Sequence, residues 1–198
     1  MIFLTSDEHH GHKNIIKYCN RPFTDVDDMS EKMIALHNAT VSPGDVVYHL
    51  GDFTLDEKKV EKNLSRLNGE HHLWMGNHDA CHPKHKKSSA ARERYLAAGF
   101  KTVQEQSVVE LEGLGKVLLC HMPLAGSGDH TDSERYTEWR PTEDMMVGVN
   151  WLLHGHIHEK WKLDVKRRMV NVGVDVWDYK PVSVVTLADF LNKSLTPE

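Results

Sequence analysis

Cysteine is scarce in this sequence, and its residues are far apart and form no C-x-x-C pair: Cys19, Cys81 and Cys120. That spacing supports neither a disulfide framework nor a zinc site made of thiolates. It favours a reducing compartment.

Long apolar runs are also missing. The apolar opening residues give way to Asp7 and His9 too early for the hydrophobic region of a secretion signal, and no later run approaches the length of a membrane span. We therefore expect a cytoplasmic protein that has no membrane partner.

Positive charge is not in excess either. The 198 residues contain 24 Lys plus Arg against 29 Asp plus Glu, a formal net charge of -5. This balance argues against a broad basic surface for a long polyanion, although a local basic patch is compatible with it. The length and the 39% hydrophobic content suit one buried core, so we expect a single domain over residues 1–198 with no obligate protein partner.

Histidine, in contrast, is abundant, with 15 residues, and it is the commonest metal ligand in proteins. Many of these histidines stand beside Asp, Asn and Gly directly after short apolar runs that predict buried strands. In the first half of the chain, strands are expected at 2–5, 46–48 and 72–75, and helices at 28–39, 56–67 and 88–98. The repeated order is a strand, a polar tip and a helix.

The second half of the chain is richer in predicted strands, at 107–111, 117–120, 151–153, 169–172 and 182–186. Two of them lead into His121 and into the run 154–158, His-Gly-His-Ile-His. In α/β proteins ligands bind beyond the carboxyl ends of the strands, so the five polar tips are expected to converge.

The residue types at these tips suit divalent metal ions. Imidazole nitrogen and carboxylate oxygen fit manganese, iron, zinc or nickel, and no cysteine accompanies them. Two carboxylates, three or four imidazoles and one amide oxygen exceed what a single ion with an open position uses, so two ions with a bridging carboxylate are expected. Such pairs, roughly 3.5–4 Å apart, hold a hydroxide and clamp a phosphoryl group. The sequence thus predicts phosphoester chemistry with two divalent ions, manganese being the first candidate.

Five motifs together resemble the signature of the calcineurin-like metallophosphoesterases. The residues around these motifs resemble those of a group of small bacterial and phage phosphoesterases. The motifs are Asp7-x-His9, Gly51-Asp52, Gly76-Asn77-His78-Asp79, His121 and Gly155-His156-x-His158. The resemblance implies an α/β fold, a four-layer α/β/β/α sandwich.

The resemblance also implies roles for these residues. Asp7, His9 and His158 would hold the first ion, and Asn77, His121 and His156 the second. Asp52 would bridge the two ions. His78 would lie beside the substrate, where it donates to a phosphoryl oxygen or protonates the leaving group, and Asp79 would tune its orientation and basicity.

One departure limits the transfer of substrate specificity. Many members continue Gly-Asp with a supporting Asp-Arg pair, which the run 51–56 of this chain lacks. We expect a phosphoric ester hydrolase that acts on a small phosphorylated substrate, with a preference for a phosphodiester of a nucleotide, a cyclic nucleotide or a nucleic-acid end. The alternatives are a phosphomonoesterase, a nuclease and a catalytically silent interaction scaffold.

Several other polar residues keep two interpretations. Arg21 can bind a substrate phosphate or anchor a loop, and the same alternatives hold for Arg135 and Arg140. The basic run 84–87 is expected to be a solvated approach to a helix, with substrate binding as the alternative. A supporting or solvated role is expected for His10, His12, His49, His71, His72 and His154.

Overall fold

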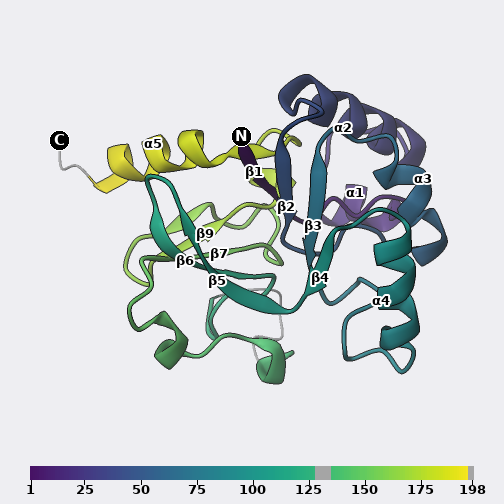
Figure 1. Ribbon diagram of the computed structural model, residues 1–198. Coiled ribbons are helices and arrows are strands. Elements are labelled where there is room, and N and C mark those ends of the chain that lie inside the picture. Colours follow the sequence, from purple (N-terminus) through teal and green to yellow (C-terminus); the bar gives the residue numbers. More distant parts are fainter. Residues whose placement is uncertain (128–134, 196–198) are drawn as a thin grey trace.

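The computed structural model describes residues 1–127 and 135–195, and two five-stranded sheets form the centre of this part of the chain (Figure 1). The first sheet has the order β10-β1-β2-β3-β4, in which β1 to β4 are parallel and β10 is antiparallel to β1. Its strands are β1 (Ile2–Thr5), β2 (Val46–His49), β3 (Glu70–Trp74), β4 (Thr102–Gln104) and β10 (Val182–Ser183). The parallel order places the ends of β1, β2 and β3 side by side.

The second sheet has the order β5-β6-β7-β9-β8. Its central strands β6, β7 and β9 are parallel, and β5 and β8 add antiparallel edges. The strands are β5 (Gln106–Leu111), β6 (Gly115–Cys120), β7 (Trp151–His154), β8 (Leu163–Asp164) and β9 (Met169–Asn171).

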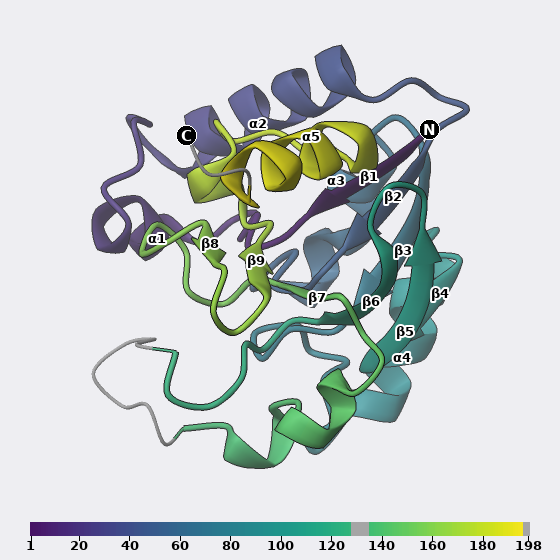
Figure 2. The ribbon, with the colours of Figure 1, turned by 90° about the vertical axis from the view of Figure 1, so that its left-hand side faces the viewer.

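Helices cover the first sheet on the side away from the second one (Figures 1 and 2). They are α1 (Lys13–Tyr18), α2 (Val26–Thr40), the 3-10 helix η1 (Glu57–Lys59), α3 (Val60–Leu64) and α4 (Ser88–Ala97). On the outer side of the second sheet lie two 3-10 helices, η2 (Thr137–Trp139) and η3 (Glu143–Met146), and η4 (Val174–Val176) follows β9. Helix α5 (Val184–Leu195) packs against the edge of the core between the sheets.

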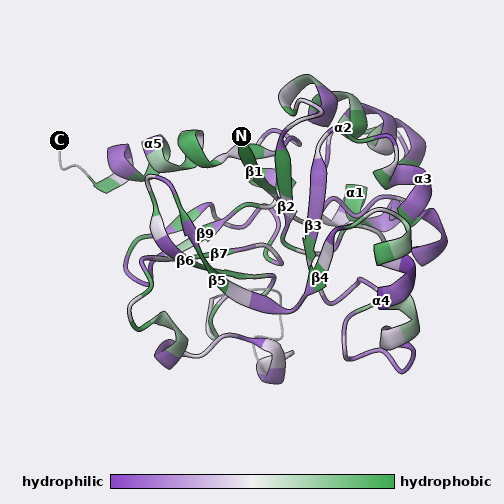
Figure 3. Cartoon of the chain, viewed as in Figure 1, coloured by the Kyte–Doolittle hydropathy of each residue, from purple (hydrophilic) through white to green (hydrophobic). Residues whose placement is uncertain are grey.

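Alternation along the strands builds the core between the two sheets. Val117 and Leu119 of β6 pack in one cluster with Leu4 of the first sheet, whereas Leu118 and Leu152 point to the outer layer around η3. Hydrophobic colouring accordingly runs along β1, β2 and β7 at the centre (Figure 3). The predicted α/β/β/α class is confirmed, and in the described residues its fourth layer consists of short 3-10 helices.

The first three predicted strands and the helices at 28–39 and 88–98 agree with the structure to within a few residues. The predicted helix at 56–67 is shorter, because η1 and α3 end at Leu64. The prediction of a strand over 182–186 is wrong beyond Ser183, where α5 begins. The β-branched residues at 184–186 favour a strand locally, but Val184, Leu187 and Leu191 share one helix face that is buried in the core. Helix α1 and strand β4 were not predicted.

Beneath α2, the first sheet buries a histidine cluster that consists of Glu8, His10, His37, His49 and His71. His49 Nδ1 lies 2.6 Å from Glu8 Oε1, and His49 Nε2 lies 3.0 Å from His71 Nδ1. Burial lowers the pKa of His10 and His37 to about 4 and that of His49 and His71 to about 3. These imidazoles are therefore neutral at neutral pH.

This cluster predicts acid lability. The unfolded histidines have a pKa near 6.5, so below that pH the unfolded chain binds more protons and the free energy of unfolding falls as the pH drops toward 4. Burial raises the pKa of Glu8 to about 7, which acts in the opposite direction, but one group opposes four. Urea unfolding of chelated protein should give a lower free energy at pH 5 than at pH 7.5.

The His37→Phe variant is the matched test, because it removes one of the four titrating groups. Its free energy of unfolding should depend less steeply on pH than that of the wild type, by at most about 1.4 kcal/mol per pH unit. A flat pH profile for the wild type would contradict the prediction.

Candidate metal centre

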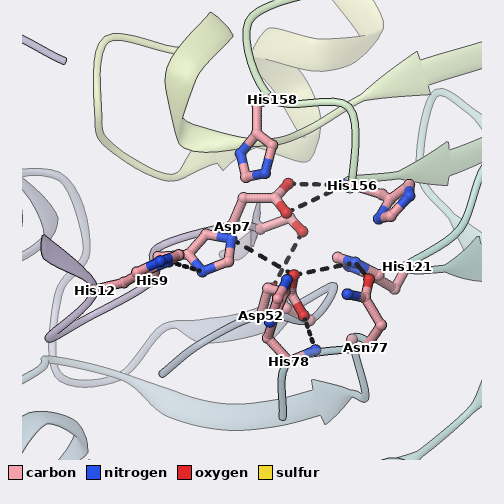
Figure 4. A network of polar contacts seen from close by, with 12 residues as sticks. Asp7, His9, His12, Asp52, Asn77, His78, His121, His156 and His158 are labelled. Atoms are coloured by element: carbon pink, nitrogen blue, oxygen red, sulfur yellow. Dashed lines mark hydrogen bonds and ion pairs between the residues drawn. The ribbon is translucent and has the colours of Figure 1, made fainter. Parts of the chain in front are cut away.

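The polar tips of the strands are joined by backbone hydrogen bonds beyond the sheet. Asp7 N–H donates to Gly51 O at 3.0 Å, and His9 N–H donates to Asp52 O at 2.9 Å. From the second sheet, His156 N–H donates to Asp7 Oδ2 at 3.0 Å. As Figure 4 shows, the side chains that follow these strands point toward one another. The predicted convergence of the tips is therefore present.

Five of the predicted ligands have the left-handed backbone conformation, which is rare for residues other than glycine. Their φ angles are 59° for Asp7, 51° for His9, 56° for Asp52, 73° for His156 and 52° for His158. Such residues cost free energy, and they persist where the surroundings fix them, often at functional sites.

Two motif glycines permit close approach of the tips. A Cβ on Gly76 would collide with the carboxylate and backbone nitrogen of Asp52, and one on Gly155 would collide with Ser6 and the Asp7 carboxylate. Glycine therefore precedes Asn77 and His156 because any larger side chain at these positions would collide with the neighbouring loop.

Asp52 lies at the middle of the site. Its Oδ2 is 3.5 Å from Nε2 of His9 and 3.5 Å from Nε2 of His121. Its Oδ1 accepts the His78 N–H at 2.7 Å, which leaves Oδ2 facing both imidazoles. This is the position that a bridging carboxylate requires.

The two imidazoles beside Asp52 are placed to offer nitrogen ligands. His121 Nδ1 lies 2.7 Å from the Leu50 carbonyl and donates to it, so Nε2 carries the lone pair, 3.1 Å from Asn77 Oδ1. His9 Nε2 is buried and has no hydrogen-bond partner in the described part of the chain. Burial lowers the pKa of His9, which makes its ring neutral, the form that binds metal.

Among the residues predicted as ligands, the ligand atoms form two overlapping groups. Those of Asp7, His9 and His158 lie within 4.8 Å of one another, and so do those of Asp7, Asp52 and His121. The first group coincides with the set predicted for the first ion. His156 lies outside both groups, with its ring centroid 5.3 Å from that of His121.

The charges in the site fit divalent cations. Burial would raise the pKa of Asp52, but His121, His78 and His9 hold it below its ordinary value, so this carboxylate is ionised. Burial raises the pKa of Asp7, as expected for a carboxylate that the chain does not fully neutralise. Buried carboxylate oxygens and imidazole nitrogens, one of them without a hydrogen bond, are suitable ligands for divalent ions.

Arg21 does not face the site, which decides between its two interpretations. Its Nε and Nη2 each lie 2.7 Å from a carboxylate oxygen of Asp175, and Nη2 also donates to Asp7 O at 2.7 Å. Arg21 is thus a buried structural anchor. Asp175 Oδ2 is in turn 3.3 Å from His158 Nδ1, so Asp175 can orient that imidazole. No local pattern in the sequence indicates a role for Asp175, because its link to His158 exists only in three dimensions.

The Asp79 carboxylate is hydrogen-bonded to the backbone of its own loop and of the loop that carries Asp52. Its carboxylate accepts the N–H groups of Asp52 at 2.8 Å, Gly76 at 2.9 Å and Phe53 at 3.1 Å. Among the described residues, no hydrogen bond or ion pair joins it to the His78 imidazole that it was expected to orient. Burial and the Asp52 charge raise its pKa to about 7. Asp79 therefore joins the loop after β2, which carries Asp52, to the loop after β3, which carries Gly76.

A cavity of about 590 Å³ opens onto the centre. Its lining includes His9, His12, Ile15, Tyr18, Cys19, Asp52, Asn77, His78, Arg135, Tyr136, His156, His158, Glu159 and Lys160. His78 and His12 thus both face the space above the predicted ligands, and their ring centroids are 6.2 Å apart. Of the supporting and solvated roles expected for His12, its contact favours the supporting one, because its Nδ1 lies 3.4 Å from Nδ1 of the predicted ligand His9.

Arg140, Arg135, Lys84 and His154 each have a hydrogen-bond partner within the chain. Arg140 is buried and donates to Pro123 O at 3.1 Å, a structural role. Arg135 and Lys84 donate to the Tyr136 hydroxyl at 2.9 and 3.5 Å. His154 is buried and donates to Gly155 O at 2.8 Å.

Comparisons with known proteins agree with these observations. The family model of the calcineurin-like phosphoesterase superfamily domain matches residues 1–189. The uncharacterized protein MJ1445 of Methanocaldococcus jannaschii is 33% identical over 97% of this chain and 92% of its own. The gene 66 protein of Mycobacterium phage L5 is 30% identical, over 96% and 93%.

Among solved structures, the protein of unknown function AQ665 from Aquifex aeolicus has a TM-score of 0.69 at 26% identity, covering 96% of this chain and 98% of its own. In the part of the chain that the structure describes, no helix has the length and apolar character needed to cross a membrane.

Asp175 provides a test of the orientation of His158. Asp175→Asn should weaken metal binding by roughly 10- to 100-fold, the usual effect of losing a carboxylate behind a histidine ligand. Isothermal titration with Mn²⁺ measures it, and the exposed Asp178→Asn is the control. Because the substitution also removes the carboxylate that pairs with the Arg21 charge, the variant's thermal midpoint should be recorded as well. Unchanged affinity in a folded variant would refute the role.

Proposed function

Because the chain belongs to the calcineurin-like phosphoesterase superfamily, we propose that it is a hydrolase that uses two divalent metal ions to cleave a phosphodiester. The observation that carries this proposal is the place of Asp52, whose Oδ2 lies 3.5 Å from a histidine nitrogen on each side. The family supports metal-dependent hydrolysis of a phosphoester. The number of ions and the type of ester belong to the proposal.

The residues present would hold two ions. Asp7, His9 and His158 would bind one, and Asn77, His121 and His156 the other, with Asp52 shared between them. When bound, such ions activate water and neutralise the charge of a phosphoryl group. Manganese is the first candidate because oxygen and imidazole donors are mixed, and iron, zinc and nickel are alternatives.

The chain itself positions the remaining groups. The His78 backbone N–H donates to Oδ1 of Asp52 at 2.7 Å, so the Asp52 carboxylate and the His78 loop are fixed together. The His78 ring faces the cavity, where it can donate a proton to the oxygen of the leaving group. Asp79 keeps this loop in place through the Gly76 and Asp52 backbone rather than through the imidazole.

A phosphodiester suits the cavity better than a small monoester. The cavity volume of about 590 Å³ falls within the range of pockets that bind small organic ligands. The space extends beyond the ligands to Ile15 and Tyr18, which gives room for a second ester group. A nucleotide, a cyclic nucleotide or a nucleic-acid end would fit this description.

The first experiment measures metal content and turnover together. Chelated protein reconstituted with Mn²⁺ should bind two ions per chain and hydrolyse bis-para-nitrophenyl phosphate faster than para-nitrophenyl phosphate. Asp52→Asn should bind fewer ions and lose at least about 1000-fold in kcat, because the shared carboxylate is removed. Asp56→Asn, on the same loop but outside the centre, is the control. Full turnover by Asp52→Asn would refute the bridging role, and faster monoester turnover would indicate a phosphatase.

His78 should separate catalysis from metal binding. His78→Gln should keep both ions, because the bond between His78 and the predicted ligand Asp52 comes from the His78 backbone N–H, which the variant retains. The variant should lower kcat by roughly 100- to 10,000-fold, because the proton donor is lost. A leaving group with a low pKa should restore much of this loss, since it departs without a proton. Loss of metal from the variant would mean that His78 is a ligand.

A further inference from the structure

One wall of the cavity presents an aromatic ring that the fold does not use. Tyr18, the last residue of α1, lines the cavity, yet its residue surface is 69% exposed. Its ring stands edge-on to His12, with the centroids 6.3 Å apart. In the described part of the chain, its hydroxyl makes no hydrogen bond. A ring that packs so little is available to a ligand.

Cationic groups and one acidic residue, Glu159, line the rest of the cavity rim. Arg135 and Lys160 line the cavity, and the Tyr136 hydroxyl accepts from Arg135 at 2.9 Å and from the exposed Lys84 at 3.5 Å. The cations of Lys84 and Arg135 also lie 4.8 and 5.0 Å from the centroid of the Tyr136 ring. This ring is thus already engaged by two cations, whereas that of Tyr18 is open.

The chemistry of a matching substrate follows from these features. It must bring a phosphodiester to the predicted ligands, a flat π-face to Tyr18 and polar or anionic groups to the cationic rim. An acyl chain does not fit, because charged residues share the cavity with Ile15 and Tyr18. The net charge of -5 argues against a broad basic surface for a long polyanion, so a short substrate is favoured.

We propose that the substrate is a nucleoside phosphodiester whose base stacks on Tyr18. This inference rests on the proposed function of the same site. Stacking of a base on an aromatic side chain tolerates any base, since every base has a π-face. Tyr18 would therefore recognise a nucleoside as a class and would be a specificity-determining residue.

Two esters with the same leaving group test the proposal: thymidine 5′-para-nitrophenyl phosphate and methyl para-nitrophenyl phosphate. The manganese-reconstituted wild type should have the higher kcat/KM for the thymidine ester. Tyr18→Ala should lower that kcat/KM by roughly 5- to 30-fold, mainly through KM, and should leave the methyl ester unaffected. Tyr18→Phe should retain the preference, because the ring remains.

The neighbouring exposed Lys17→Ala is the matched control, and it should change neither ester. Equal wild-type kcat/KM for the two esters, or an equal fall for both in Tyr18→Ala, would overturn the stacking proposal while leaving phosphodiester hydrolysis standing. Absence of turnover for both esters and for bis-para-nitrophenyl phosphate would instead overturn the proposed function itself.

Discussion

Three buried aspartates hold the strand tips together by accepting hydrogen bonds from the backbone of neighbouring tips. Asp7 accepts the N–H of His156, which follows β7 of the second sheet, and Asp52 accepts the N–H of His78, which follows β3. Asp79 accepts three N–H groups from the second and third tips. A buried carboxylate needs such partners, because an unpaired charge in the interior is costly. The same carboxylates therefore determine where the histidines can stand.

This arrangement explains why the backbone of the site is unusual. Left-handed residues and glycines that admit no Cβ are needed to bring five tips within reach of one centre. Each left-handed residue costs roughly 1–3 kcal/mol and persists only where its surroundings fix it. Here those surroundings are the two packed sheets and the backbone bonds to the aspartates. The packing of the core thus offsets the free energy that the strained backbone of the site costs.

The sequence predicted the parts of this design that depend on local pattern. Apolar runs that end in Asp, Asn or His indicated the strands, and the position of the polar residues at the strand ends predicted that they converge. The nine predicted site residues lie around one centre, and their roles as ligands remain a prediction. Helix α5 was missed because its first residues, Val184 and Val185, favour a strand until the buried face of the helix is considered.

The supporting residues could not be predicted from the sequence, since they act across long separations. Asp175 lies 17 positions from His158 and 154 from Arg21, and nothing local distinguishes it from other acidic residues. Asp79 stands next to His78 in the sequence, which suggested a direct contact, but in the turn its carboxylate points to the backbone of Asp52. Adjacency in sequence was therefore the less informative guide here.

These supports also make the two sides of the centre chemically unequal. His158 is backed by the Asp175 carboxylate, and its pKa is raised by Asp7 and Asp175 against the effect of burial. His121 is instead backed by the neutral carbonyl of Leu50, 2.7 Å from Nδ1. A carboxylate behind an imidazole makes it a more basic ligand than a carbonyl does. His158 is therefore the more basic of the two imidazoles, and if Asp52 bridges two ions as proposed, the two ions would be bound with different affinity.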